Sequence, residues 1–303
     1  MQRRRDGNQR AIGAWTLDPV QVLVPLVYAA AYATRARTLR RSGRPVAAGK
    51  QACFHAGIAV VIVALCSPLD AAHRFDGHMA QHLLLGDIAP LLIVLGLDGR
   101  ILRPILAFRW VRSLRVLAHP LVAFPLWVIN LCAWHTPALY EAALRNELVH
   151  ALEHGMFFTC GALMWAAVVE PLPGPGWFGT AWKAAYVLAA RTVGAALASV
   201  FIWAGHPIYG AYHSLGDQVV AGALMFTEGG IVTLIAFGWL FLRWTREAEL
   251  RQSLLDAGAD PRVAQRAGRY GATPGTVPAV AASRSDSTRS DSWRAKHTRF
   301  VTK

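Results

Sequence analysis

Residues 134–158, WHTPALYEAALRNELVHALEHGMFF, place three histidines where apolar segments begin or end. His150 and His154 are four residues apart, so a helix would carry both imidazoles on one face, about one turn apart along its axis. A long apolar run follows them, and His135 directly follows another such run, WVINLCAW. The stretch therefore predicts helices that enter a membrane, with histidines gathered where these helices emerge.

The composition also indicates a membrane protein. Of the 303 residues, 54% are hydrophobic and 16% are charged, which is too apolar for a soluble domain of this size. The net charge of +13 does not indicate nucleic acid as a partner, because the basic residues lie between apolar runs and in the C-terminal tail. The four cysteines lie within apolar runs without a C-x-x-C pair, which argues against a disulfide framework or a zinc ribbon. No cleavable signal peptide is expected, since no A-x-A-like site follows the N-terminal MQRRRDGNQR.

Seven segments are apolar enough, and approach the ~20 residues needed, to cross the hydrocarbon core. They are residues 15–33, 51–67, 79–97, 117–134, 150–169, 184–204 and 219–242. The predicted fold is therefore all-α, a polytopic membrane protein with a bundle of about seven transmembrane helices. Residues 1–14 form an N-terminal segment and residues 15–243 the membrane domain. Residues 244–303 form a basic tail rich in Ser and Arg that is expected to be disordered.

The distribution of arginine predicts the orientation. Loops 34–50 and 98–116 are rich in Arg, whereas the loops on the opposite side contain only Arg74 and Arg145. By the positive-inside rule the Arg-rich loops are cytoplasmic, the N-terminus is outside and the C-terminus is cytoplasmic. The arginines of the N-terminal segment disagree with this assignment, but the internal loops agree with one another. We therefore expect a multi-pass protein of the cell (inner) membrane.

Histidines concentrate on the outer, periplasmic side of this topology. Eight of the eleven fall there: His73, His78, His82, His135, His150, His154, His206 and His213. His78 and His82 repeat the spacing of His150 and His154. Neutral imidazole is a ligand for copper, zinc, iron or nickel, and nearby Met and Cys residues favour copper, particularly Cu(I). A single interfacial histidine, by contrast, is more often just an amphipathic residue with a wet end.

The predicted metal ligands are His78, His82, His135, His150 and His154. We expect them at a wet rim of the bundle, where binding is reversible. Glu153 and Asp217 are predicted to orient imidazoles by accepting the distal N–H, although Asp217 is also well placed as a helix N-cap. Thr136 and Pro137 are predicted to begin a short interfacial helix before the fifth span.

Three ionisable residues lie inside predicted spans, where a charge is costly and tends to face a partner in the bundle interior. Asp87 and Glu228 fall at similar depth, so they are predicted to form a polar floor to the site or a proton-linked relay. Arg191 either joins them or extends its side chain to the nearer membrane surface.

Several motifs resemble those of the CtaG family of cytochrome c oxidase assembly proteins, over residues 15–243. They are H-M-x-Q-H-L-L-L at 78–85, W-H-x-P-x-L-Y at 134–140, H-x-L-E-H at 150–154 and D-Q at 217–218. The resemblance implies an assembly factor, not an enzyme, that supports maturation of a haem–copper oxidase. It implies copper bound transiently at the outer face, with oxidase subunits and the lipid bilayer as partners and no nucleic acid.

Three alternatives remain open from the residues. A b-type cytochrome with bis-histidine haem would need facing histidines within the hydrocarbon, whereas these cluster at one edge. A membrane metallohydrolase would need H-E-x-x-H, but in H-A-L-E-H the glutamate directly precedes the second histidine and projects about 100° away from it. A structural membrane interaction protein would need none of these histidines.

Overall fold

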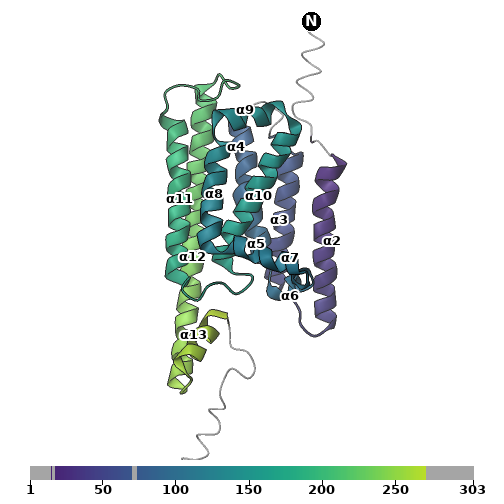
Figure 1. Cartoon of the computed structure of the whole chain (residues 1–303), viewed down its shortest axis with the longest axis vertical. Coiled ribbons are helices and arrows are strands. Elements are labelled where there is room, and N and C mark those ends of the chain that lie inside the picture. Colours follow the sequence, from purple (N-terminus) through teal and green to yellow (C-terminus); the bar gives the residue numbers. More distant parts are fainter. Residues whose placement is uncertain (1–14, 16–17, 70–73, 271–303) are drawn as a thin grey trace, which may run out of the picture. The chain divides into compact units, whose positions relative to one another are not determined.

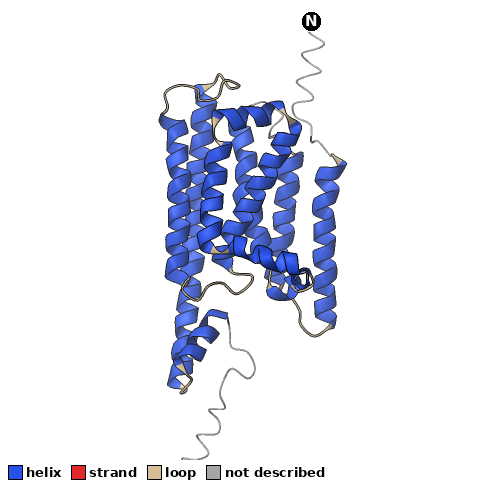
Figure 2. Ribbon diagram, viewed as in Figure 1, coloured by secondary structure: helices blue, strands red, loops and turns tan. Residues whose placement is uncertain are grey.

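The structure is a computed structural model that describes residues 15, 18–69 and 74–270. Regular structure in these residues is helical throughout (Figure 1, Figure 2), which confirms the all-α prediction. The chain divides into two compact units, Met1–Ala236 and Phe237–Lys303. The predicted segment 1–14, His73 and the tail beyond residue 270 lie outside the described residues.

Nine helices, the last of which continues into the second unit, form the main elements of the described part of the first unit. In chain order they are α2 (Pro19–Arg41), α3 (Ala48–Cys66), α4 (Phe75–Leu83), α5 (Ala89–Gly96), α8 (Pro120–Trp134), α9 (Pro137–Arg145), α10 (Glu147–Val169), α11 (Thr180–Trp203) and α12 (Leu215–Asp256). A π-helical turn, η1 (Leu84–Ile88), joins α4 to α5 without a break. Four short elements lead from α5 to α8: α6 (Gly99–Leu102), η2 (Ile105–Ala107), α7 (Arg109–Ser113) and η3 (Leu114–Ala118).

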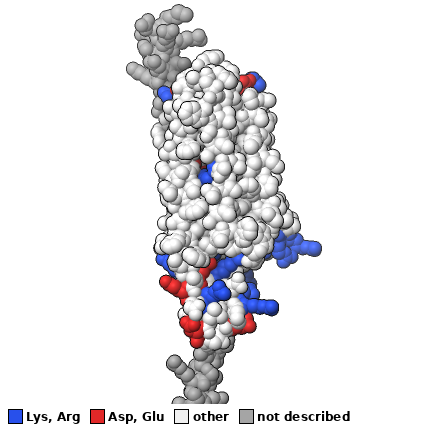
Figure 3. All heavy atoms as spheres, turned by 90° about the vertical axis from the view of Figure 1, so that its left-hand side faces the viewer, with Lys and Arg blue, Asp and Glu red and all other residues white. Residues whose placement is uncertain are grey.

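Five helices among the described residues are long and apolar enough to cross a membrane: α3, the continuous α4–η1–α5, α10, α11 and α12. A sixth results if α8 is joined to residues Arg109–Ala118 across a bend of 74°. When the molecule is viewed from the side of α11 and α12, its surface shows a broad belt almost free of charged residues (Figure 3). A multi-pass membrane protein is thus supported with five or six spans, and the count of seven stays a prediction.

Helix α10 lies at the centre of the bundle and contacts α5, η1, α8, α9 and α11. Its close approach to η1 depends on Gly161, because a Cβ at this position would collide with the carbonyl oxygen of Gly86. Pro90 lacks the N–H that would bond this carbonyl in a regular helix. The packing of Gly161 against the η1 turn therefore fixes α10 beside α4, and this pairing positions the candidate site.

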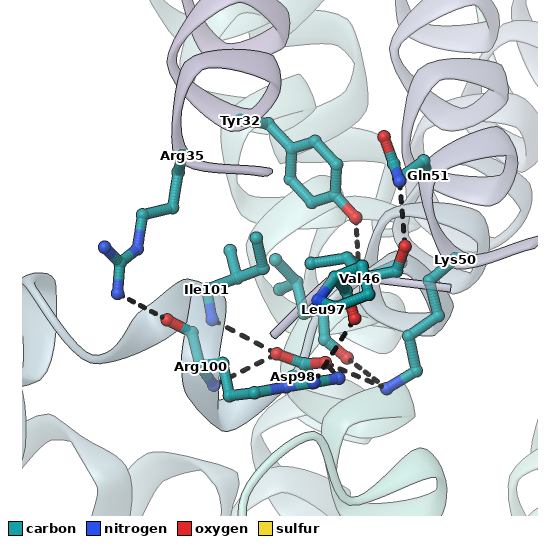
Figure 4. Close-up of polar contacts among 11 residues, drawn as sticks. Tyr32, Arg35, Val46, Lys50, Gln51, Leu97, Asp98, Arg100 and Ile101 are labelled. Carbon is teal, nitrogen blue, oxygen red and sulfur yellow. Dashed lines mark hydrogen bonds and ion pairs between the residues drawn. The ribbon is translucent and has the colours of Figure 1, made fainter. Parts of the chain in front are cut away.

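The opposite end of the bundle is held by a polar network around Asp98 (Figure 4). The Asp98 carboxylate accepts hydrogen bonds from the backbone N–H groups of Arg100 and Ile101, which caps α6, and it pairs with Lys50 of α3 at 3.6 Å. Tyr32 of α2 donates to the carbonyl of Gly96 at 2.9 Å. Burial alone would raise the pKa of Asp98, but these hydrogen bonds and nearby cations lower it. The network ties α2 and α3 to the end of α5.

Between residues 244 and 270 the described part of the second unit is largely helical, where the sequence predicted a disordered tail. Helix α12 continues to Asp256, and α13 (Pro261–Tyr270) follows a short turn. The two elements share an apolar core made of Leu250, Leu254, Leu255, Ala259, Ala264 and Ala267. Small and apolar residues at helical spacing therefore order this part of the chain, although its composition is polar and basic.

Candidate metal centre

Two helices present the histidine pairs at one end of the bundle. His78 and His82 lie on α4, whereas His150 and His154 lie in the first turns of α10. Asn146 caps the N-terminus of α10, because its side chain accepts hydrogen bonds from the N–H groups of Leu148 and Val149. Figure 1 shows the start of α4, the start of α10 and α9 at the same end. Both i, i+4 pairs therefore occupy the same level of the bundle.

The four imidazoles face one another across the α4–α10 contact. Ring centroids are 4.2 Å apart within each pair, His78 to His82 and His150 to His154. Between the helices the distance is 5.3 Å from His78 to His150 and 5.3 Å from His82 to His154. The spacing predicted one helix face for each pair, and the structure brings the two faces together.

Glu153 lies among these rings rather than behind them. Its Oε2 is 3.7 Å from Nε2 of His82 and 4.0 Å from Nε2 of His78. One ligand-type atom from each of His78, His82, His150 and Glu153 lies within 4.8 Å of the other three. Donors that bind one ion at about 2 Å are separated by up to about 4 Å, so small side-chain movements would bring these four onto a single cation.

The prediction of a wet rim is wrong for His78, His82 and His135, which are buried. His78 and Glu153 are fully buried, and His82 is 4% exposed. Helix α9, which starts at Pro137 after Thr136 as predicted, carries Tyr140 against the ring of His78. Tyr140 stacks in turn on Tyr209 of the loop between α11 and α12. These two elements cover His78, whereas His150 and His154 are half-buried.

The covering loop is fixed by side chains that the sequence analysis did not assign. The amide of Gln218 accepts a hydrogen bond from Ile208 N–H and donates to the carbonyls of Phe201 and His206. Tyr209 donates its hydroxyl proton to the carbonyl of His135 at 3.0 Å. The D-Q motif thus contributes through its glutamine, which holds the loop closed over the site.

His135 lies beside the cluster but is not one of the four converging groups. Its Nδ1 is 2.8 Å from the carbonyl of Leu131, so this nitrogen donates and Nε2 is left as an acceptor. Among the described residues Nε2 has no hydrogen-bond partner. Burial lowers the pKa of His135 to about 4, against a weaker opposing effect of the hydrogen bond. The ring is therefore neutral at pH 7, with a lone pair available to a metal.

Asp217 and the exposed histidines lie outside the cluster. The Asp217 carboxylate is 3.5 Å from the guanidinium of Arg74, and its own N–H donates to the hydroxyl of Ser214, which takes the predicted capping role. The hydrogen bond to Asp76 raises the pKa of Arg74. His206 and His213 are both exposed. None of these side chains is placed to orient an imidazole of the cluster.

The buried carboxylate of Glu153 determines which ions the cluster can bind. A carboxylate removed from water is stable only beside a cation or with a bound proton. His82 offers two ring nitrogens without a hydrogen-bond partner among the described residues. Imidazole nitrogens with one carboxylate oxygen form a donor set for a first-row transition metal and differ from the all-oxygen sites of Mg²⁺ or Ca²⁺. The residues present therefore fit a transition-metal cation.

A second polar group lies deeper, beside a cavity of about 370 Å³. His82 and His135 line this cavity together with Asp87, Arg191 and Glu228. Asp87 and Glu228 were predicted to lie at a similar depth in the membrane. In the structure Arg191 lies between them and contacts both carboxyl groups, so its side chain points into the bundle and not toward the membrane surface. Trp165 donates its indole N–H to Asp87, a contact that was not predicted from the sequence.

Fold and site together define a helical, membrane-spanning protein with a buried histidine–carboxylate centre at one end. The family model for the cytochrome c oxidase caa3 assembly factor matches residues 30–247. The chain belongs to this family.

The similar curated proteins extend well beyond this chain. One is an uncharacterized protein of Mycobacterium bovis and another is an uncharacterized protein of Mycobacterium tuberculosis. Each is 28% identical over 184 residues, an alignment that covers 55% of this chain and 28% of the relative. The chain thus spans less than a third of the length of these relatives. No solved structure matches it.

Proposed function

We propose that this assembly factor binds a copper ion as cargo at the cluster of His78, His82, His150 and Glu153 and delivers it to a subunit of a haem–copper oxidase. The observation that carries this proposal is the convergence of the four groups within 4.8 Å. Cu(I), which accepts three or four nitrogen and soft donors, would also balance the charge of Glu153. The protein acts by binding and transfer, without a catalysed reaction of its own.

The geometry does not favour a haem between the histidine pairs. The rings of His78 and His150 are stacked, with 17° between their planes. Glu153 lies within 4.8 Å of both, so no flat slot for a macrocycle separates them. His154 and His135 are the nearest further imidazoles, and we assign them to capture or release of the ion.

The function is tested by metal analysis of protein purified without a histidine tag. We expect about one copper per chain after exposure to Cu(I), and no Soret absorption. A strain that lacks this protein should assemble oxidase with reduced copper content, and expression of the wild-type chain should restore it. Protein that binds no copper, or a Soret band from a stoichiometric haem, would contradict the assignment.

We also propose that the histidine-bearing end faces the outside of the cell membrane and that the C-terminus is cytoplasmic. The Arg-rich loops between α2 and α3 and between α5 and α8 lie at the end of the bundle away from α9 (Figure 1). Reporter fusions after residues 109 and 140 test this orientation. We expect a cytoplasmic signal at 109 and a periplasmic signal at 140, and the reverse pattern would mean that copper is collected from the cytoplasm.

A further inference from the structure

Asp87, Arg191 and Glu228 form an ion cluster, the acid triad, within the membrane-spanning part of the bundle. They come from three segments: η1, α11 and α12. The Arg191 guanidinium is within hydrogen-bond distance of the Asp87 carboxylate, and its Nη1 is 3.8 Å from Oε2 of Glu228. Their side chains are 13%, 10% and 17% exposed for Arg191, Asp87 and Glu228 respectively. All three line the 370 Å³ cavity.

The acid triad has one more acid than base. Arginine stays protonated in proteins, so two ionised carboxylates would leave a net charge of −1 between mostly apolar walls. Such a charge is costly within a membrane, and two carboxylates that share one site do not both ionise readily. A single bound proton makes the triad neutral.

The contacts indicate which carboxyl group holds the proton. Asp87 has the closer contact with Arg191 and also accepts the indole N–H of Trp165, and both contacts stabilise a carboxylate. Glu228 is farther from the guanidinium, with 3.8 Å between Nη1 of Arg191 and Oε2 of Glu228. Glu228 is therefore the group that carries the proton.

A second buried ion pair in the same bundle provides the contrast. Lys183 donates to Glu170 at 2.7 Å, and their side chains are 1% and 2% exposed. One carboxylate and one ammonium group balance each other. Burial alone therefore does not require Glu170 to be protonated. At the acid triad a proton is required because two carboxyl groups face one guanidinium group.

We propose that the acid triad binds one exchangeable proton, held by Glu228, and that this proton leaves when a copper ion occupies the histidine cluster. The second half rests on the proposed function. Titratable groups that line the cavity are His82 from α4, Asp87 from η1, His135 after α8, Arg191 from α11 and Glu228 from α12, and α10 contributes none. A cation beside His82 favours the ionised form of Glu228 through this shared cavity.

The exchange involves no redox step and leaves the summed charge of the two sites unchanged, because Cu⁺ neutralises the Glu153 carboxylate and the negative charge then resides on Glu228. One Cu⁺ enters the histidine cluster, the O–H bond of Glu228 breaks, and the proton passes to water. A cavity of this size with polar groups at both ends can hold several waters. Copper then leaves more readily when Glu228 is protonated again, which gives the protein a means of release at the oxidase.

Infrared difference spectroscopy tests the proton site without copper. Wild-type protein should show the carbonyl stretch of a protonated carboxylic acid, and Glu228→Gln should lose it. Asp87→Asn should lose the same band although Glu228 is retained, because one acid and one base then remain and Glu228 ionises. The control Lys183→Met, Glu170→Gln, which removes a buried carboxyl group together with its balancing charge, should keep the band. A band that persists in both triad variants, or is missing from wild type, would overturn the proposal.

The coupling to copper is tested separately. Cu(I) titrations with a pH-indicating dye should show proton release by wild type that falls in Glu228→Gln. The affinity for Cu(I) should rise with pH by about tenfold more in wild type than in the variant, within the usual range for coupled sites. Equal pH dependence would refute the coupling. Absence of copper binding by wild type would refute the proposed function, while the infrared band would still decide whether Glu228 holds a proton.

Discussion

Protein with both His78→Gln and His82→Gln should bind Cu(I) more than about 100-fold more weakly than wild type. The change removes two of the four converging donors, and loss of even an outer hydrogen-bond partner of a metal ligand costs about 10- to 100-fold in affinity. Gln is chosen because both positions are buried, so that a smaller side chain would leave a cavity. Competition with a chelator of known Cu(I) affinity measures the effect, and copper content of the oxidase measures its consequence.

The matched control is the pair His206→Gln and His213→Gln. Both histidines lie near the same end of the bundle, but they are exposed and outside the cluster. This control should bind copper like the wild type. If the two double variants bind copper equally well, copper is held elsewhere and the histidines of α4 have a packing role.

Periodicity was sufficient to predict the pairing of the histidines. A spacing of four residues defines a helix face regardless of context, so His78 with His82 and His150 with His154 could be predicted to form two ligand ladders. Apolar length likewise identifies membrane helices because the bilayer sets the length. These predictions depend on local geometry, which the sequence specifies directly.

Burial of the cluster depends on contacts that the sequence pattern does not specify. The histidines lie near helix ends, which suggested a wet rim, but α9 and the loop anchored by Gln218 fold across them. Glu153 was predicted to orient imidazoles by accepting the distal N–H, and not to lie among the ligands. The α4–α10 packing brings its carboxylate within 4.0 Å of His78 and His82. The position of α4 relative to α10 therefore determines whether Glu153 lies among the histidines.

The acid triad and the histidine cluster show how buried charge can be organised around one cavity. Glu153 requires a cation or proton, and the triad has one carboxylate in excess. His82 and Glu228 line the same cavity. Binding of copper at the histidine cluster therefore changes the free energy needed to ionise Glu228. A protein that must bind an ion firmly and then release it benefits from such a coupled pair, because protonation changes affinity without rebuilding the ligands.

Replacing Lys183 alone should be among the most destabilising single changes in the bundle. Lys183, in the first turn of α11, meets Glu170, which ends α10 in the left-handed conformation at φ 55°. Both side chains are almost completely buried. Removal of one partner leaves an uncompensated charge, and breaking such a pair costs about 3–5 kcal/mol. We expect Lys183→Met to lower the free energy of unfolding by this amount, measured by reversible unfolding in mixed micelles.

The double variant Lys183→Met, Glu170→Gln separates the pair from simple loss of packing. With both charges removed no ion is left buried, so most of the lost stability should return, and the cycle of single and double variants gives the coupling. Arg145→Met is the surface control, because the Arg145–Glu141 pair leaves Arg145 70% exposed and exposed pairs contribute little. A double variant as unstable as Lys183→Met would show that the lysine side chain stabilises the α10–α11 connection by packing and not by its charge.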